Sequence, residues 1–277
     1  MQYRRVGSEQ KSLTPIPQFL LLILSLFVAM FLNASNAQSA PPTGAVSRDS
    51  VALGMLSNAL VSLGGTVAWT QVHATHVEGS MLLPDGSSGT IDWIDDWSQG
   101  TPRYRRQSNQ GSATHVSAHD GSPFFTIHQG IKALHVREFD KTVALLAHMP
   151  GAALSEILSN PNYGVKLGHS SDDPSLAEID VISANRGWPK SKSEEKWFIS
   201  KQSGLPAYVS FNTHDALGSS QEIWQTVLFS HYKTQGNLTV PDQIAEVFPN
   251  KQQIRYSLTS FEINPQTIPS DFTGGNQ

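Results

Sequence analysis

The stretch SGTIDWIDDW at residues 88–97 places three carboxylates and two tryptophans within one short segment. Paired carboxylates act as acid and base in glycoside hydrolases, where they converge across a cleft of about 5–10 Å. On a β-strand, alternate side chains point to opposite faces, so Asp92 and Asp96 share one face and Asp95 points to the other. Two carboxylates in line along a strand do not converge in this way. We therefore predict a strand with an aromatic face and a solvated acidic face, and keep a hydrolase that uses Asp92 or Asp96 with a histidine as an alternative.

The segment RYRRQ at residues 103–107 alternates in the same way. Arg103 and Arg105 would share one face of a strand, and Tyr104 and Arg106 the other. Opposite charges on neighbouring strands stabilise an antiparallel pair. We predict that this basic strand lies across the sheet from the acidic strand.

Ten histidines invite a metal hypothesis, but their spacing does not favour one. His73 and His76 are an odd number of residues apart and would face opposite sides of a strand. His115 and His119 share a face, but in a short segment that runs into a turn. The sequence contains no HExxH array, no G-x-S-x-G elbow and no phosphate-binding loop. We expect no metal, no cofactor and no enzymatic activity.

Composition excludes several classes of protein. The 277 residues include no cysteine, so there is no disulfide framework, no thiolate metal site and no lipobox cysteine to acylate. The formal net charge is −4 and no basic cluster occurs, which argues against a nucleic-acid partner. A chain of this length can bury a sizeable core within one fairly large domain, and we expect a monomer.

The N-terminus has the organisation of a secretory signal peptide. Basic residues precede an uncharged apolar run at residues 19–32, and the small residues Ser35 and Ala37 follow it. The run is shorter than the roughly 20 residues that span a bilayer. We predict a signal peptide over residues 1–37 cleaved after Ala37, a linker over 38–46, no membrane span in the mature chain, and a periplasmic or secreted protein. An uncleaved anchor is the alternative.

A change of period marks the first elements of the mature chain. Apolar residues at helical spacing predict a helix over residues 47–63, capped by Ser47 or Asp49 and ended by Gly64 and Gly65. From Thr66 onward the period changes to two, and short strands alternate with turns rich in Gly, Asp and Pro. This spacing is typical of an antiparallel meander.

A second helical region follows over residues 140–160, where Pro150 must break or restart the helix. Strands then resume, and the apolar positions of the last one change parity, which predicts a β-bulge near Thr259. Residues 273–277 have the composition of a disordered tail. The order of elements predicts an α+β domain with a single large antiparallel sheet.

Several strands are apolar on both faces. In EKWFISK at residues 195–201, for example, Trp197 and Ile199 would point to one face of the strand and Phe198 to the other. Such strands need cover on both faces, and two helical segments can hardly cover both faces of a large sheet. The remaining face is either curled on itself or available to an apolar ligand. We take four tryptophans as candidate ligand-binding residues: Trp69, Trp93, Trp97 and Trp224.

Three segments resemble the LolA/LolB-type periplasmic lipoprotein carriers: KWFISKQSGLPAYVSF (196–211), VLFSHYKTQGNLTVPDQIAEV (227–247) and FEINPQTIPSDF (261–272). The resemblance implies a half-barrel domain over residues 47–272, in which a curved sheet wraps around helices. We expect these to be the N-terminal helix and the central helical insert. It also implies an apolar concave face that accommodates acyl chains. The insert at 140–160 matches no element of the carriers.

The leading hypothesis is an exported soluble protein that holds a lipid, an acylated protein or another apolar ligand in the concave face of the half-barrel. The alternative from a different class is an envelope interaction or sensor module that recognises a protein partner and carries no cargo.

Overall fold

The computed structural model describes residues 46–98, 103–121, 125–128, 131–134, 149–169, 171–183, 193–214 and 222–273. The chain divides into two units, residues 1–45 and 46–277, and the fold described below is that of the second. The predicted signal peptide, its cleavage site, residues 140–148 of the helical insert and most of the predicted tail lie outside the described residues.

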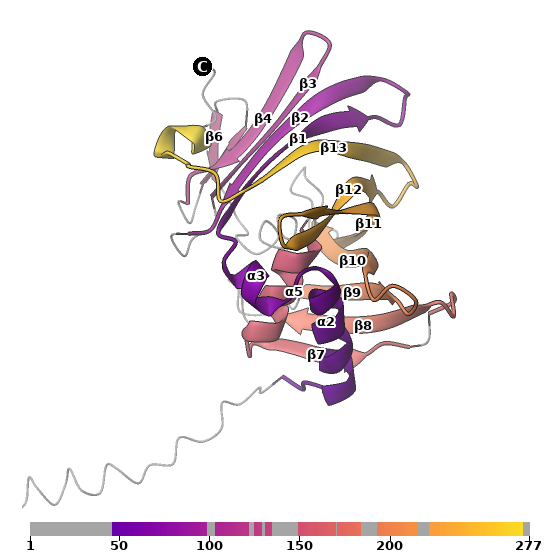
Figure 1. The fold of residues 1–277 in the computed structure, drawn as a ribbon. Helices are drawn as coiled ribbons and strands as arrows, with labels where there is room; N and C mark the ends of the chain where they lie inside the picture. Colours follow the sequence, from indigo (N-terminus) through magenta and orange to yellow (C-terminus); the bar gives the residue numbers. More distant parts are fainter. Residues whose placement is uncertain are drawn as a thin grey trace, which may run out of the picture. The chain divides into compact units, whose positions relative to one another are not determined.

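The strands of the described residues form one sheet in the order β6-β5-β4-β3-β2-β1-β13-β12-β11-β10-β9-β8-β7, and every neighbouring pair is antiparallel. Two meanders, β1 to β6 and β7 to β13, are joined because the first strand pairs with the last (Figure 1). The strands are β1 (Ala74–Leu82), β2 (Ser88–Asp96), β3 (Arg103–Gln110), β4 (Ala113–His119), β5 (Phe125–His128), β6 (Ile131–Leu134), β7 (Tyr163–Leu167), β8 (Leu176–Ser183), β9 (Ser193–Ser200), β10 (Pro206–His214), β11 (Glu222–Gln235), β12 (Leu238–Val247) and β13 (Gln253–Ile263).

The helices lie on one face of this curved sheet (Figure 1). They are α2 (Ser50–Ser62), α3 (Thr66–Thr70) and α5 (Pro150–Ser159), and a 3-10 turn, η1 (Pro269–Phe272), follows the last strand. The α+β class, with a large antiparallel sheet wrapped around the N-terminal helix and the helical insert, is therefore confirmed.

The caps of α2 follow the prediction. The Asp49 carboxylate accepts hydrogen bonds from the amides of Val51 and Ala52 at 2.9 and 2.8 Å, which satisfies donors that the first turn leaves free. Gly64 and Gly65 have φ of 116° and 89°, a region that glycine enters without steric cost. The chain can therefore reverse directly after the helix.

The strand predicted from Thr66 onward is wrong over its first residues. Thr66–Thr70 forms the short helix α3, and β1 begins only at Ala74. The indole of Trp69 donates a hydrogen bond to the carbonyl oxygen of Leu63, at 2.8 Å, and so ties α3 to the end of α2. This tertiary contact outweighs the weak alternation of the segment.

Two local predictions are confirmed. A helix of the predicted helical region begins at Pro150, the first residue of α5, where its missing N–H costs nothing. The bulge lies at Thr259: Glu78 pairs with Ser260 while the next residue, Gly79, pairs with Leu258. The extra residue explains why the apolar positions of β13 change parity.

The N-terminal segment also covers one edge of the sheet. Val165 of β7 donates to the carbonyl of Ser47 and accepts from the amide of Asp49, at 2.9 and 2.7 Å. The intervening Arg48 donates to three carbonyls at the C-terminal end of α5, at 2.7–3.1 Å. These contacts fix α2 and α5 against β7 and satisfy carbonyls that a helix end leaves unpaired.

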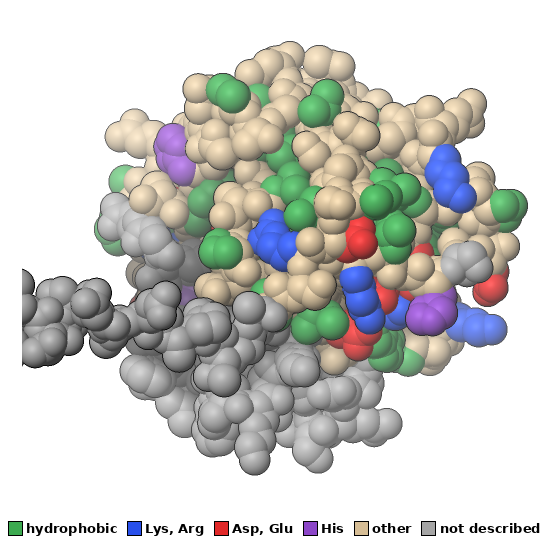
Figure 2. All heavy atoms as spheres, turned by 90° about the horizontal axis from the view of Figure 1, so that it is seen from below, with side chains coloured by type: hydrophobic (Ala, Val, Ile, Leu, Met, Phe, Trp, Pro, Cys, Tyr) green, Lys and Arg blue, Asp and Glu red, His purple; other side chains and the backbone are tan. Residues whose placement is uncertain are grey.

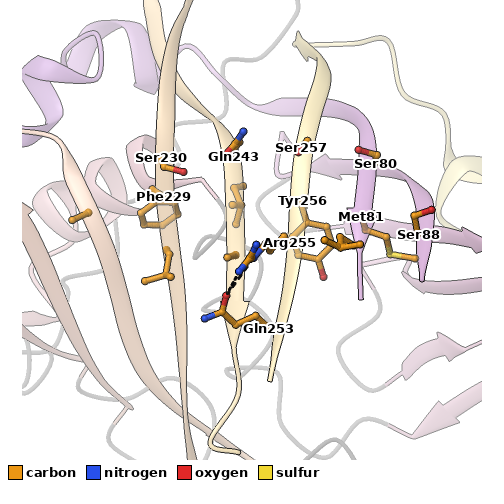
Figure 3. A pocket seen from close by; sticks show the side chains of 15 residues that line it. Ser80, Met81, Ser88, Phe229, Ser230, Gln243, Gln253, Arg255, Tyr256 and Ser257 are labelled. Carbon is orange, nitrogen blue, oxygen red and sulfur yellow. Dashed lines mark hydrogen bonds between the residues drawn. The ribbon is translucent and has the colours of Figure 1, made fainter. Parts of the chain in front are cut away.

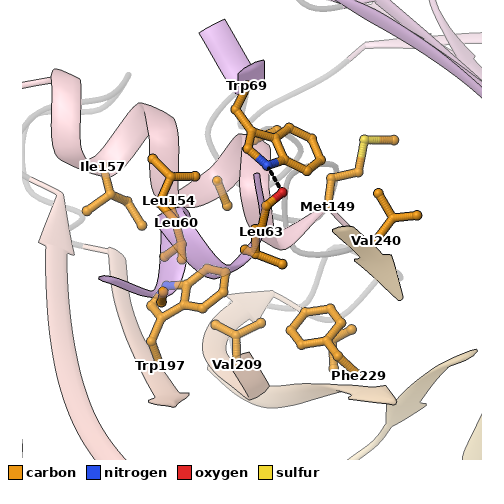
Figure 4. Close-up of a cluster of buried hydrophobic side chains, with 14 of the residues drawn as sticks. Leu60, Leu63, Trp69, Met149, Leu154, Ile157, Trp197, Val209, Phe229 and Val240 are labelled. Atoms are coloured by element: carbon orange, nitrogen blue, oxygen red, sulfur yellow. Dashed lines mark hydrogen bonds between the residues drawn. The ribbon is translucent and has the colours of Figure 1, made fainter. Parts of the chain in front are cut away.

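The helices pack on β9 to β12 through a continuous cluster of buried hydrophobic side chains (Figure 4). Burying each large side chain of this kind contributes about 1.5–3 kcal/mol. Members shown in Figure 4 are Leu60, Leu63, Trp69, Met149, Leu154, Ile157, Trp197, Val209, Phe229 and Val240.

One contact in this core is testable by a pair of glycine substitutions. A Cβ at Gly151 would overlap the indole ring of Trp69, whereas a Cβ at Gly54, in the middle of α2, would meet nothing within 4 Å. We expect Gly151→Ala to lower the free energy of unfolding by about 1–3 kcal/mol through overpacking. Gly54→Ala should raise it by about 0.5–1 kcal/mol because alanine is the better helix former. Urea unfolding measures both, and a Gly151→Ala variant as stable as Gly54→Ala would contradict the packing described here.

Candidate ligand-binding face

The sheet has an inner face, which carries the helices, and an outer face. Phe229 of β11 belongs to the inner face, because it packs beneath the helices (Figure 4). Phe229 pairs with Ile244 on β12, Ile244 pairs with Tyr256 on β13, and Tyr256 pairs with Met81 on β1. Directly paired residues point to the same side of a sheet, so all four face inward. All four are buried.

The part of the inner face on β13, β1 and β2 is rich in aromatic side chains. Trp93 meets Tyr256 edge to face, with ring centroids 4.8 Å apart and planes at 67°. We call this part the aromatic section and define it by its buried residues: Val77, Met81, Ile91, Trp93, Tyr256, Leu258 and Phe261. In Figure 1 the helices lie under β7 to β12, while β13 and β1 to β4 extend beyond them.

An ion pair adjoins the aromatic section on the inner face. Arg106 of β3 and Asp95 of β2 approach to 2.9 Å, and the Asp95 side chain is fully buried. The Arg106 guanidinium carbon also lies 4.6 Å from the centroid of the Trp93 ring, in cation–π geometry. This part of the inner face therefore combines apolar side chains with a buried pair of opposite charges.

The predicted pairing of the basic and acidic strands is confirmed. Asp96 pairs with Arg103 and Ile94 with Arg105 in the register of β2 and β3. Arg105 contacts Asp92 at 3.3 Å, and His76 contacts the same carboxylate at 3.1 Å on the outer face. In the part of the chain that the structure describes, no hydroxyl is hydrogen-bonded to His76. Asp92 and His76 thus form a carboxylate–histidine pair on the outer face.

The prediction of a solvated acidic face is wrong for Asp96, which is 2% exposed. Its carboxylate accepts hydrogen bonds from the amide and the hydroxyl of Ser98, at 2.8 and 2.7 Å, and from Thr267 and Arg103. The C-terminal segment that supplies Thr267 crosses the outer face here, and the ring of Phe272 stacks on Arg103, 4.6 Å from centroid to guanidinium carbon. Asp96 therefore anchors the end of the chain to the sheet.

The four candidate tryptophans lie in different surroundings. Trp69 is buried between the helices, and Trp93 lies in the aromatic section. Trp97, just after β2, is partly buried and donates to the carbonyl of Val72 at 3.0 Å. Trp224 of β11 is 42% exposed, and its partner on β10 is Asn212. Since Phe229 faces inward, Trp224, five residues earlier on β11, faces outward. The structure therefore does not bring the four together.

A hollow of about 770 Å³ is lined by residues of six strands, β10 to β13, β1 and β2 (Figure 3). Most of these residues face outward, but the lining also includes the inward-facing Met81, Phe229, Ile244 and Tyr256. Its exposed polar side chains form a row of direct cross-strand partners, Ser230, Gln243, Ser257 and Ser80. Among the described residues of its lining, Arg255 is the only charged one, and it contacts Gln253 at 3.4 Å. Sequence analysis missed this hollow, because serine and glutamine on the polar face of a strand give no signal of a site.

Exposed large hydrophobic residues are spread over several elements of the described chain: Val51, Val61, Val67, Leu82, Leu167, Trp224 and Ile268. On the face shown in Figure 2, hydrophobic side chains are scattered among polar atoms, and acidic and basic groups lie side by side. Among the described residues, no helix is long and apolar enough to cross a membrane, and no group of three or more His, Cys, Asp or Glu could hold a metal ion.

Comparison with models of protein families and with curated proteins finds no match. Solved structures that are similar include an outer membrane lipoprotein-sorting protein domain from Vibrio parahaemolyticus (10% identity, TM-score 0.43), a LolA superfamily protein from Nitrosomonas europaea (10%, 0.44) and a DUF1329 family protein from Desulfovibrio piger (7%, 0.48). In each case the match covers 80% of this chain and 96% of the other. The resemblance to LolA-type proteins is thus found again in the structure, and it concerns the fold alone.

The anchoring role of Asp96 gives a pH dependence. Burial by itself would raise the pKa of Asp96, but the hydrogen bonds from Ser98, Thr267 and Arg103 outweigh it and lower the pKa from 3.8 to about 2. A carboxyl whose pKa is lower in the folded protein stabilises the fold above its ordinary pKa. This contribution, about 2 kcal/mol, is lost as the pH falls from about 4 to about 2.

We expect Asp96→Asn to be less stable than the wild type at pH 7 and to lose less further stability between pH 4 and pH 2. Urea unfolding at a series of pH values measures this difference. Parallel curves for the two proteins over that interval would show that Asp96 does not carry the dependence.

Proposed function

We propose that this protein is an exported binding protein that holds a lipid or another acylated ligand against the aromatic section of the inner face. The observation that carries the proposal is the aromatic section itself. It is an apolar, aromatic surface on strands that extend beyond the helices, and aromatic surfaces of this kind bury large areas of an apolar partner.

The arrangement of the helices supports this choice of location. α2, α3 and α5 already occupy the inner face at β7 to β12, where Leu60, Leu154 and Trp197 are almost fully buried. That half serves as the core of the domain. The hollow described above has a lining of mixed polarity, in which hydroxyl and amide groups lie beside apolar side chains such as Leu82 and Leu228. An acyl chain bound there would cover polar groups, which is costly unless they find new partners. Among the described residues, the aromatic section is the part of the apolar inner face that lies on strands beyond the helices.

The side chains of the aromatic section are buried in this conformation. Under the proposal, a ligand exchanges with the atoms that now cover this face, so the unliganded protein has a closed resting form. Burying an apolar ligand in place of these contacts conserves the apolar environment of Trp93 and Tyr256. The exchange therefore need not expose the core to water.

The test of the function is organic extraction of the exported protein, purified without detergent, followed by mass spectrometry. The proposal predicts a stoichiometric acyl species. A folded protein free of lipid, together with one stoichiometric protein partner in a pull-down, would overturn it in favour of the interaction module.

Two tryptophan variants test the location. We expect Trp93→Ala to weaken binding of a fluorescent acyl probe on the order of tenfold, because it removes an aromatic wall of the site. The matched control is Trp224→Ala on the outer face, which should stay within about twofold of the wild type. Because Trp93→Ala creates a cavity that costs about 3–5 kcal/mol, Trp93→Phe serves as a better folded second variant with an intermediate loss. Equal losses at positions 93 and 224 would contradict the location.

Export is tested separately by N-terminal sequencing of the secreted or periplasmic protein. The predicted signal peptide implies a start at Gln38, directly after Ala37. A chain that starts at Met1 would show that the leader is retained.

A further inference from the structure

The guanidinium of Arg106 has an unusual environment for a charged group on an apolar face. Its two terminal nitrogens, Nη1 and Nη2, are buried and have no hydrogen-bond acceptor among the described residues. Asp95 lies 2.9 Å from Nη2 and supplies opposite charge, but not an aligned hydrogen bond. Arginine carries five N–H donors in a rigid fork, and buried donors without acceptors are rare in native proteins. The side chain keeps 19% of its surface exposed.

The position of this fork is fixed on two sides. The Trp93 ring lies 4.6 Å from the guanidinium carbon, and Asp95 holds one terminal nitrogen through its charge. Trp93 in turn packs edge to face on Tyr256. The donors are therefore held in place beside the apolar surface before any ligand arrives, which lowers the entropic cost of binding an acceptor.

The charges around the fork decide the kind of acceptor. Asp95 already neutralises the guanidinium, and the Glu246 carboxylate lies within reach of Tyr256 on the same face. An anionic headgroup would add a further negative charge to a buried site, which is costly. An uncharged carbonyl oxygen accepts hydrogen bonds from arginine without this cost.

We propose that Arg106 binds the ester or amide carbonyl of an acyl group, so that the ligand is an esterified or amidated acyl chain and not a hydrocarbon or a free fatty acid. The chain lies on the aromatic section while its first carbonyl oxygen accepts from the Arg106 fork. This inference rests on the proposed function and adds the chemical class of the ligand.

The test compares three displacers of one fluorescent acyl probe that share a chain of the same length: dodecane, methyl dodecanoate and dodecanoate at neutral pH. For the wild type we expect the ester to bind about tenfold or more tightly than the hydrocarbon, as one hydrogen bond to a charged donor provides. The free fatty acid anion should bind more weakly than the ester.

The decisive variant replaces both members of the pair, Asp95→Leu with Arg106→Met, so that no buried charge is left alone. Replacement of a buried ion pair by apolar residues of similar volume is often neutral for stability. The double variant should bind the ester and the hydrocarbon within about twofold of each other. Arg106→Lys, which keeps the charge opposite Asp95 but loses the planar fork, should show a reduced preference. Arg105→Met, on the neighbouring outward-facing residue, is the matched control and should keep the full preference.

Each outcome has one meaning. A wild type that binds neither the probe nor any displacer would refute the proposed function itself. A wild type that binds the probe but does not distinguish ester from hydrocarbon would refute only the role of Arg106. Tighter binding of the anion than of the ester would also refute the proposed role of Arg106, since it would show that the site favours negative charge.

Discussion

The fold depends on one constraint, the need to cover the apolar inner face of a large antiparallel sheet. Because β1 pairs with β13, the two meanders form a single sheet whose inner face is far wider than two or three short helices can cover. Arg48 and the Ser47–Asp49 segment hold α2 and α5 at the β7 side. This attachment places the helical core on the β7 side of the sheet and leaves the aromatic section on the central strands β13, β1 and β2.

The outer face meets a different requirement. Several of its carboxylates are paired with arginine, lysine or histidine across strands, as in Asp92 with Arg105 and Asp180 with Lys196. Asp96 also accepts a hydrogen bond from Thr267 in the C-terminal segment, and it is buried beneath that segment. The same short strand, β2, thus supplies an anchor for the C-terminal segment on one face and the buried Asp95 on the other.

Much of this could be predicted from local pattern. The ends of α2 follow from Asp49 and the two glycines, and the bulge at Thr259 follows from a change of parity, since both signals lie within a few residues of the feature. The faces of β2 follow from simple alternation. The burial of Asp96 could not be predicted in this way, because Thr267, which covers it, is 171 residues distant. α3 was missed because its stability comes from the Trp69 contact and not from its own five residues.

In the candidate site, too, local pattern predicts some features, while others depend on contacts between distant parts of the chain. Alternation places Trp93 and Asp95 on one face, but only the three-dimensional structure shows that this face is the inner one and that Arg106 stacks on Trp93. A buried ion pair is a poor source of stability, since desolvation offsets most of its attraction and an apolar replacement is often as stable. The Asp95–Arg106 pair is therefore hard to explain by the needs of the core. A pair that instead holds donors in place toward an apolar surface is useful to a protein that must distinguish an acyl carbonyl from plain hydrocarbon.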